Sequence, residues 1–318
     1  MAKSVLLSAG GGGHTGYAYA LAQRLHGRAK LTFLVPEGDT LSQKRLSKFG
    51  DVYFLLKARG AKTSNIQLIP RLVKAFWDSL RLVTFDYNVV VSTGSNFSIP
   101  PAFVAWLKRI PLINIESSVR FTKASKTALI LQPFSTFTIL HWEEQRKLLK
   151  KGIVAGPLLP EPQVKPWNGG YILVTGGTLG HKLLFDAVSE SGLENVVLQT
   201  GQINPEPYAK EHPKWKVLSF STTFYELVAG AELVVTHFGS TALEVVVYRK
   251  PMVLVLNPEW KRTVGKTDAE IFADKVAAAF LWDVNPRILK KAMEEAKNMK
   301  LPCFKDGAKK LAEMILKL

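Results

Sequence analysis

Cysteine is almost absent, because the 318-residue chain has only one, Cys303. A single thiol cannot form an internal disulfide, and one cysteine with six scattered histidines does not make a zinc site. These absences exclude a disulfide framework and a cysteine-based zinc site. We therefore expect a protein of a reducing compartment.

Long hydrophobic runs are missing too. The first apolar stretch, residues 5–7, is soon followed by four consecutive glycines and is too short for a signal peptide or a membrane-spanning helix. Apolar residues make up 47% and charged residues 21%, as in ordinary folded proteins. We expect a folded protein that is cytosolic or lies on the cytosolic face of a membrane.

Acidic residues are scarce relative to basic ones, with 26 Asp and Glu against 42 Lys and Arg and a net charge of +16. This imbalance indicates an anionic partner. The sequence shows no nucleic-acid-binding motif and no short element that interleaves basic and aromatic residues, which argues against DNA or RNA. A membrane surface or a diphosphate is the better expectation.

Short apolar runs alternate with helical patterns. The runs are SVLLSA, LTFLVP, YNVVVSTG and PLINIES, then YILVTGGT, NVVLQTG, ELVVTHFGST and PMVLVL. Runs that are apolar on both faces and separated by helices predict parallel strands. The proline-dense segment PLLPEPQVKPWNGG divides the two sets and reads as a linker.

We therefore predict an α/β protein with two Rossmann-like, doubly wound parallel-sheet domains that face each other across a cleft. The predicted parts are an N-terminal domain at 1–156, a linker at 157–170, a C-terminal domain at 171–305 and a Lys-rich amphipathic helix at 306–318. Ligands of such sheets bind at the loops that follow the carboxyl ends of the strands. The chemistry is expected on those loops.

The loop SAGGGGHTG joins the first apolar run to the first helix. Its bare backbone N–H groups and the helix N-terminus suit a phosphate. His14 stands at that N-terminus, where the helix dipole favours the neutral imidazole that can accept a proton. We expect a general base, with a helix-capping histidine as the alternative. Gly11, Gly13 and Gly16, with Glu37 further on, match a dinucleotide fingerprint only loosely.

A second turn of small residues between a strand and a helix lies in VVTHFGSTALEVV, residues 234–246. Gly239, Ser240 and Thr241 offer amides and hydroxyls to a phosphate at the helix N-terminus. Glu244 lies about one turn further along, where a carboxylate can accept both hydroxyls of a ribose. The alternative is that Glu244 is a surface residue of the helix.

Two further loops follow apolar runs. In VTGGTLGH, Gly176 and Gly177 either face the same ligand or form a tight turn. In INIESSVRFTKASKT, Glu116 stands just beyond a strand and is followed by Arg120 and two lysines. A carboxylate with cations at a strand end suits a sugar and a diphosphate, and a solvated loop is the alternative.

Two segments suit a membrane interface. On the helix predicted within 66–85, one face carries apolar side chains: Ile69, Leu72, Val73, Phe76, Leu80 and Val83. Residues 100–111 add Trp106, Lys108 and Arg109. An ordinary core-facing helix is the alternative for the first segment.

Taken together, these motifs resemble those of glycosyltransferases with the two-domain GT-B fold. The first half, through GGGGHT, STGSN with PPAF, INIESSVR and AGPL, is similar to the membrane-recruiting subunit of the eukaryotic transferase that adds the second GlcNAc to dolichol-diphosphate-GlcNAc. The second half, through VTGGT, LQTG and AELVVTHFGSTALEVVVYRKPMVLVLN, is similar to its catalytic subunit. The chain thus resembles a fusion of the two, and more distantly the bacterial transferase that converts lipid I to lipid II.

The resemblance implies an inverting, metal-independent transfer of GlcNAc from UDP-GlcNAc to a lipid-diphosphate-linked GlcNAc, which gives a β-1,4-linked chitobiose for N-glycan assembly. It implies no cofactor, and a peripheral position on the cytoplasmic face of an anionic membrane through 66–85 and 100–111. High lysine with few Asn and Gln, together with the fused layout, favours an archaeon. The alternatives are a UDP-GlcNAc epimerase, an NAD-dependent oxidoreductase and a non-catalytic UDP-binding membrane scaffold.

The same resemblance implies which residues act. It assigns catalysis to His14 and Glu116 and leaves open which of them is the base. The acceptor-binding residues are Gly11, Gly12, Gly13, Thr15, Ser95, Asn96, Ser117 and Arg120. The donor-binding residues are Gly176, Gly177, Thr178, Gln199, Gly201, Phe220, Ser221, His237, Gly239, Ser240, Thr241 and Glu244. The paired glutamines of the bacterial family have no clear counterpart in KRTVGKTDAEIF, where the nearest candidates are Thr267, Asp268 and Glu270.

Overall fold

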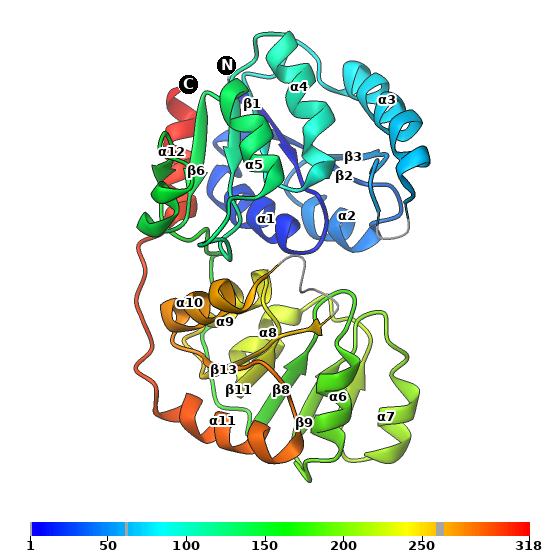
Figure 1. Cartoon of the computed structure of the whole chain (residues 1–318), viewed down its shortest axis with the longest axis vertical. Helices are drawn as coiled ribbons and strands as arrows, with labels where there is room; N and C mark the ends of the chain where they lie inside the picture. The colour runs from blue at the N-terminus through cyan, green and yellow to red at the C-terminus, as the bar shows by residue number, and fades with distance from the viewer. Residues whose placement is uncertain (1, 61–62, 259–263) are drawn as a thin grey trace. The chain divides into compact units, whose positions relative to one another are not determined.

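The computed structural model describes residues 2–60, 63–258 and 264–318, and the chain divides into two compact units (Figure 1). Unit 1 comprises Met1–Pro160 and Phe304–Leu318, and unit 2 comprises Glu161–Cys303. Unit 1 is therefore made from both ends of the chain, because the last residues return to it after unit 2.

The described part of unit 1 is built on a seven-stranded sheet of parallel pairs in the order β3-β2-β1-β4-β5-β6-β7. Its strands are β1 (Lys3–Ser8), β2 (Ala29–Pro36), β3 (Asp51–Leu55), β4 (Val89–Ser92), β5 (Leu112–Ile115), β6 (Phe137–Leu140) and β7 (Ile153–Val154). Every residue of β4 and β5 is buried, as expected for strands covered by helices on both faces.

The helices that pack around this sheet are α1 (Gly13–Leu25), α2 (Thr40–Leu46), α3 (Asn65–Leu82), α4 (Ile99–Leu107), α5 (Lys126–Leu131) and α12 (Gly307–Lys317). Side-chain caps mark several of their starts. Asp39 caps α2, Ser64 caps α3 and Ser125 caps α5, each accepting a hydrogen bond from a backbone N–H of the first turn. These caps explain where the helices begin.

The strand order of unit 1 reverses between β1 and β4. The chain runs outward from β1 through β2 to β3, and then returns to place β4 on the other side of β1. In open parallel sheets the ligand binds outside the carboxyl ends of the strands at this reversal. The loops after β1 and β4 therefore define where a site in unit 1 is expected.

Unit 2 repeats this plan with parallel pairs in the order β10-β9-β8-β11-β12-β13. Its strands are β8 (Tyr171–Thr175), β9 (Val196–Gln199), β10 (Lys216–Leu218), β11 (Ala231–Thr236), β12 (Met252–Val255) and β13 (Ala279–Leu281). Its helices are α6 (Lys182–Ser189), α7 (Glu206–Glu211), α8 (Phe224–Gly230), α9 (Ser240–Val247), α10 (Lys266–Val276) and α11 (Pro286–Asn298). The order reverses between β8 and β11, and the two doubly wound parallel sheets confirm the predicted fold class.

The proline-dense segment is shared between the units. Leu158 donates its backbone N–H to His141 of unit 1, whereas Trp167 donates its own to the carbonyl of Ala229 in unit 2. The chain crosses from one unit to the other between these two anchored points, after Pro160.

The C-terminal helix α12 packs on α1 within unit 1. Arg24 of α1 donates from Nε and Nη2 to the same carboxylate oxygen of Asp306, at 3.0 and 2.7 Å. Gly307 lies so close to the turn at Gly156 that an added Cβ would stand 2.2 Å from the Gly156 carbonyl oxygen. This close approach fixes the start of α12 against the end of the first part of the chain.

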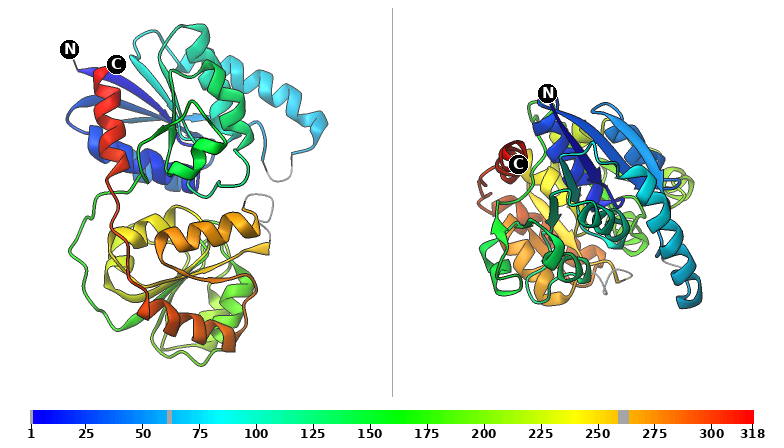
Figure 2. Two further views of the ribbon diagram at one scale, coloured as in Figure 1. Left: turned by 60° about the vertical axis from the view of Figure 1, so that its left-hand side comes forward. Right: turned by 90° about the horizontal axis from the view of Figure 1, so that it is seen from above.

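Helix α3 projects from the body of unit 1 (Figure 2), and its apolar face differs from the predicted one. Phe76 and Leu80 pack against the core of unit 1 and Val83 is fully buried, whereas Ile69 and Val73 are exposed. The apolar residues of α3 form two rows. Helix α4 packs against one row, and the other row is exposed to solvent. No helix among the described residues is long and apolar enough to cross a membrane.

Candidate active site

The glycine loop after β1 packs directly on the loop after β4. Gly10 is required by this contact, since an added Cβ would lie 2.1 Å from the hydroxyl oxygen of Ser95. Gly11 has φ +85°, a conformation that other residues rarely adopt. Helix α1 begins at Gly13, and the N–H groups of His14 and Thr15 already donate to the carbonyls of Gly11 and Gly12, so the backbone N–H groups that this loop offers to a ligand are those of Gly12 and Gly13. The arrangement is suited to an anion.

His14, which follows the glycine loop, contacts the loop after β4. Its Nδ1 lies 2.7 Å from the carbonyl oxygen of Thr93, and because a carbonyl only accepts, Nδ1 carries the proton. Nε2 is then the ring nitrogen with a lone pair to accept a proton. Gly94, next along the chain, has φ +88° and would place a Cβ 3.1 Å from the imidazole ring. The backbone of the β4 loop therefore fixes both the tautomer and the orientation of His14.

The electrostatic surroundings of His14 keep it neutral. Burial lowers the pKa of its imidazole below the usual 6.5, the hydrogen bond to Thr93 opposes this change, and the positive charge of Lys57 adds to it. The N-terminus of α1 acts in the same direction as Lys57. A neutral histidine of fixed tautomer at the mouth of an anion-binding loop has the properties of a general base.

Glu116 is fully buried at the end of β5. One carboxylate oxygen accepts the backbone N–H of Ser117 at 2.6 Å and the other accepts that of Ser125 at 2.8 Å. Burial raises the pKa of Glu116, and its hydrogen bonds with Ser117 and Ser125 and the charge of Arg120 oppose the rise. The carboxylate thus closes the loop 117–125 upon itself, which suits a positioning role better than contact with a substrate.

Several residues that the sequence analysis did not single out hold this loop to the rest of unit 1. The hydroxyl of Tyr17 in α1 donates to Ser118 Oγ at 2.9 Å and accepts the Ser118 backbone N–H at 3.0 Å. The buried His141 contacts the Glu116 carbonyl through Nε2 at 3.0 Å, and its ring packs on Tyr17. Gln145 donates to the carbonyls of Ser117 and Arg120. The His14 helix and the Glu116 loop therefore form one connected cluster.

The other predicted acceptor residues have mixed surroundings. The hydroxyl of Thr15 is buried and paired with Ser42 of α2, so it joins two helices. Ser95 has φ +67° and accepts the backbone N–H of Phe97, which opens a short 3-10 turn. Asn96 donates to the carbonyl of Arg59 at 3.4 Å. Gly12 has nothing within 4 Å of an added Cβ and therefore borders open space.

The loops after β8 and β11 pack together in unit 2 as the loops after β1 and β4 do in unit 1. Gly177 has φ +67°, and an added Cβ would stand 2.6 Å from the His237 ring. Gly201, after β9, would in turn meet the Gly177 carbonyl oxygen at 2.4 Å. Burial and the neighbouring His181 lower the pKa of His237 to about 4, so this histidine is neutral. The predicted donor glycines thus meet at the reversal of the sheet.

The N-terminus of α9 carries Ser240 and Thr241, with Gly239 just before it. Both residues are half-buried, and the backbone N–H groups of this first turn suit an anion. Glu244 lies one turn further along and is only 7% exposed, so the alternative of a surface residue is wrong.

Gln199 connects two of the predicted donor loops. Its Oε1 accepts the backbone N–H of Ser221 at 3.1 Å, and its Nε2 donates to Thr175 Oγ1 at 3.4 Å. The amide is thereby used to position the loop that contains Ser221 and the half-exposed Phe220. Thr178 contributes its carbonyl to the N–H of Gln202.

The sugar-contact candidates lie on α10. Asp268 is buried in the first turn, and Glu270 is partly exposed and pairs with Lys266. Residues 261–263 of the same motif lie outside the described residues. Within the described part of the chain, no group of three or more His, Cys, Asp and Glu side chains is placed to hold a metal ion.

Comparisons with known proteins also divide the chain, between residues 158 and 171. Residues 5–158 match the family described as "Oligosaccharide biosynthesis protein Alg14 like", and residues 171–315 match the "Glycosyltransferase family 28 C-terminal domain". The chain joins an Alg14-like domain to a family 28 glycosyltransferase domain. The expectation of a glycosyltransferase, and the resemblance to both kinds of relative, are confirmed.

Two curated relatives represent the two kinds. The UDP-N-acetylglucosamine--N-acetylmuramyl-(pentapeptide) pyrophosphoryl-undecaprenol N-acetylglucosamine transferase of Syntrophotalea carbinolica is 28% identical over 311 residues, covering 89% of this chain and 86% of that protein. The UDP-N-acetylglucosamine transferase subunit ALG14 of Candida albicans is 28% identical over 155 residues, 44% of this chain and 70% of that protein.

A solved structure bears out the fold. The crystal structure of Acinetobacter baumannii MurG matches with a TM-score of 0.68 and 20% identity, over 99% of this chain and all of that one. The predicted two-domain glycosyltransferase fold is confirmed by this likeness.

Proposed function

We propose that this glycosyltransferase moves GlcNAc from UDP-GlcNAc to a hydroxyl of a sugar that is carried on a lipid diphosphate, with inversion. The observation that carries the proposal is the bond between His14 Nδ1 and the Thr93 carbonyl, which leaves Nε2 of a neutral imidazole as the proton acceptor. The names of the relatives support the donor and the lipid-linked class of acceptor.

In the proposed reaction, His14 Nε2 takes the proton of the acceptor hydroxyl as its oxygen attacks the anomeric carbon of GlcNAc. The new bond forms between that oxygen and the anomeric carbon, and the bond to UDP breaks with its electron pair leaving on the diphosphate. The N–H groups at the start of α9 stabilise this growing negative charge. Such donors act without a metal, so we expect transfer to continue in EDTA.

Glu116 positions the acceptor loop in this proposal and is not the base. Its carboxylate is enclosed by backbone N–H groups of its own loop, whereas His14 is only partly buried. Ser117 and Arg120 follow it on that loop, where their backbone groups are fixed by Gln145. In this proposal, the fixed loop forms one side of the binding site for the acceptor sugar.

For the acceptor, we propose dolichyl-diphosphate-GlcNAc, so that the product is a β-1,4-linked chitobiose of N-glycan assembly. The match of residues 5–158 to the Alg14-like family supports this choice over a peptidoglycan precursor. Both acceptors share a lipid diphosphate, so only a direct comparison of the two distinguishes them.

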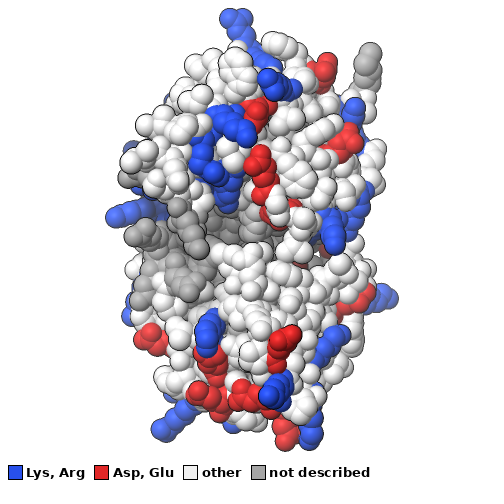
Figure 3. Space-filling view, turned by 90° about the vertical axis from the view of Figure 1, so that its right-hand side faces the viewer, with Lys and Arg blue, Asp and Glu red and all other residues white. Residues whose placement is uncertain are grey.

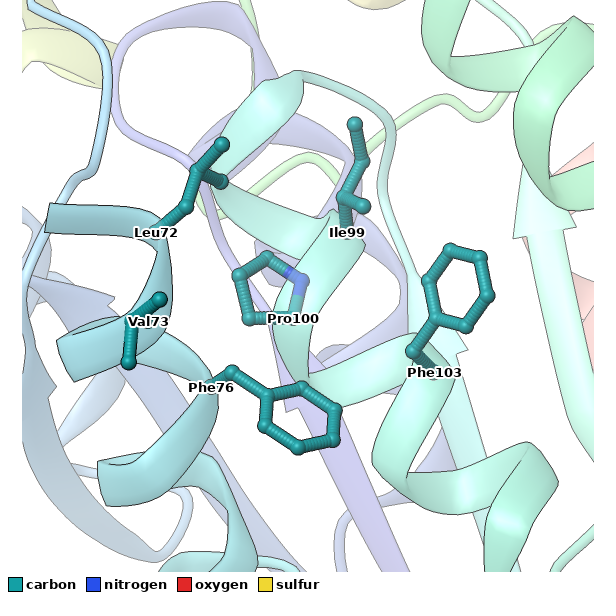
Figure 4. A pocket seen from close by; sticks show the side chains of 6 residues that line it. All are labelled: Leu72, Val73, Phe76, Ile99, Pro100 and Phe103. Carbon is teal, nitrogen blue, oxygen red and sulfur yellow. The ribbon is translucent and has the colours of Figure 1, made fainter. Parts of the chain in front are cut away.

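A membrane surface is the proposed place of the reaction. The exposed row of α3 is formed by Ile66, Ile69, Val73 and Trp77. Beside it, an apolar pocket of about 290 Å³ opens between α3 and α4 (Figure 4) and is lined by Leu72, Val73, Phe76, Ile99, Pro100 and Phe103. Lys74 and Arg81 of the same helix are exposed. In the upper part of Figure 3, Lys and Arg side chains lie among both uncharged and acidic surface. An apolar row with nearby cations suits peripheral binding to anionic lipid.

The test is transfer of labelled GlcNAc from UDP-GlcNAc to synthetic dolichyl-diphosphate-GlcNAc in EDTA, compared with lipid I as acceptor. His14→Asn keeps an N–H for the Thr93 carbonyl but has no base, so we expect kcat to fall by about 10²–10⁴-fold. His26→Asn, an exposed histidine at the other end of α1, is the matched control and keeps full activity.

The pH profile gives a second reading of the same variant. A base must be neutral, so wild-type activity is full above the pKa of His14 and is lost as the pH falls through it, which occurs below 6.5. The residual activity of His14→Asn has no such limb. Epimerisation of UDP-GlcNAc without acceptor, or binding of UDP with no transfer to either acceptor, would refute the proposal and favour the epimerase or the scaffold.

A further inference from the structure

A lysine that the glycosyltransferase mechanism above does not use is turned toward the glycine loop. Lys57 follows β3, and its Nζ donates to the Gly10 carbonyl oxygen at 3.0 Å. The two residues are 47 positions apart in the sequence, and Lys57 is half-buried. Its ammonium group therefore contacts the glycine loop just before α1 begins.

The backbone that carries Lys57 is fixed from two sides. Arg71 of α3 donates from Nη2 to the Lys57 carbonyl at 2.9 Å and from Nε to the Ala58 carbonyl at 3.1 Å. Asn96, in the loop after β4, holds the carbonyl of Arg59. Because this backbone is anchored, the Lys57 side chain is held in its position beside the glycine loop.

The ammonium of Lys57 makes no ion pair among the residues that the structure describes, although the charge of Asp39 opposes the fall in its pKa that burial causes. Its hydrogen-bond partner there is a neutral carbonyl, and no carboxylate oxygen lies within ion-pair distance. The two carboxylate oxygens of Asp39 accept hydrogen bonds from the N–H and the hydroxyl of Ser42 at the start of α2. A half-buried cation with two unused N–H donors favours an anion as its partner.

We propose that Lys57 binds the diphosphate of the lipid-linked acceptor, together with the backbone N–H groups of Gly12 and Gly13, and so places the acceptor sugar at His14. This inference rests on the proposed function. The diphosphate accepts hydrogen bonds from the Lys57 ammonium and from backbone N–H groups, and the Gly10 carbonyl shares the ammonium with it. Lys57 is thus a binding residue for the acceptor and, through its charge, a positioning residue for the base.

The second role predicts a change that a purely structural lysine would not cause. The titratable groups around His14 are Lys57 after β3 and Tyr17 on α1. Beyond them lie Asp39, which borders the glycine loop and acts on Lys57, and Glu116 and His141 next to Tyr17. Of these, Lys57 contributes the charge that lowers the pKa of His14. Its removal raises the pKa of His14, so the acid limb of the activity profile moves to higher pH.

The experiment compares Lys57→Gln and Lys57→Arg with wild type in the transfer assay, and uses Lys44→Gln of α2 as a control that removes one exposed positive charge from the same unit. For Lys57→Gln we expect the KM of the acceptor to rise by about ten- to a hundredfold while the KM of UDP-GlcNAc stays constant. Lys57→Arg keeps the charge and most of the affinity. The acid limb moves to higher pH in Lys57→Gln alone.

Binding of inorganic pyrophosphate, measured by calorimetry with UDP held at saturation, tests the site without any reaction. We expect wild type and Lys44→Gln to bind alike and Lys57→Gln to bind about tenfold more weakly. Thermal unfolding and UDP binding report whether each variant is folded. Lys57→Ala serves as a second variant if the glutamine disturbs Gly10.

The inference is overturned if a folded Lys57→Gln keeps the acceptor KM, the pyrophosphate affinity and the acid limb of Lys44→Gln. Lys57 would then only satisfy the Gly10 carbonyl. A fall in kcat with both KM values unchanged overturns it equally. Absence of transfer by wild type is a failure of the proposed function, and the pyrophosphate titration still decides whether Lys57 binds a diphosphate.

Discussion

At the scale of single residues, the two candidate catalytic side chains of unit 1 have opposite surroundings. His14 is held by one bond at Nδ1 and leaves Nε2 available, whereas both oxygens of Glu116 accept backbone N–H groups of the loop that follows it. The first arrangement leaves a base available to a substrate, and the second holds a loop in place. The same atoms therefore predict different consequences when each residue is changed.

Glu116→Gln should destabilise unit 1 and weaken acceptor binding. A glutamine presents an NH₂ group to one of the two backbone N–H groups, which leaves a buried donor without an acceptor and costs about 1–3 kcal/mol. Denaturant unfolding measures the loss, and acceptor kinetics measure the displaced loop as a raised KM. Glu143→Gln, at an exposed site, is the control. Unchanged stability with a hundredfold lower kcat would instead make Glu116 the base.

At the scale of elements, the strands could be predicted from the sequence, and the contacts between loops could not. In the runs VVVS and LINI three of the four residues are apolar and they fall on both faces, as expected for a strand that is covered on both sides. The glycines and His14 were found because the chain places them directly after a strand. Lys57 and His141 follow strands as well, but their roles depend on partners 47 and 25 residues away, and no local pattern encodes those contacts.

The sequence predicts a single apolar face on α3, and the structure divides those residues between two rows. Apolar residues occur on it at spacings that fit two adjoining rows, and composition does not tell which row α4 covers. The structure leaves Ile66, Ile69, Val73 and Trp77 in solvent and turns Phe76 and Leu80 inward. The exposed row lies one step around the helix from the core row, so membrane binding and core packing use different residues.

Replacing Val73 and Trp77 by serine should therefore reduce membrane binding without unfolding unit 1. Each side chain buried in the lipid interface contributes roughly 1.5–3 kcal/mol, so we expect the affinity for anionic vesicles to fall by at least about tenfold. Vesicle co-sedimentation measures the change, and kinetics with a short-chain soluble acceptor should stay constant. Leu183→Ser, an exposed leucine of α6 in unit 2, is the control. Equal vesicle binding by both variants would contradict the assignment.

At the scale of the whole molecule, the last segment of the chain belongs to unit 1 although it follows unit 2 in the sequence. The family 28 match extends to residue 315 and so includes α12, yet α12 packs on α1 in unit 1. His14 belongs to unit 1, and the N-terminus of α9 belongs to unit 2. The last segment of the chain therefore stabilises the unit that holds His14.

This placement predicts that mutations in α12 damage unit 1 and spare unit 2. Leu311 and Ile315 are fully buried, so replacing both with alanine should cost about 2–5 kcal/mol for each and lower the unfolding midpoint of unit 1. UDP binding, which reports unit 2 in the proposed function, should keep its affinity at temperatures where transfer is already lost. Lys309→Ala, an exposed change on the same helix, should leave both readings as in wild type. If UDP binding were lost at the same temperature as transfer in the double variant, α12 would have to stabilise both units, and its assignment to unit 1 would be wrong.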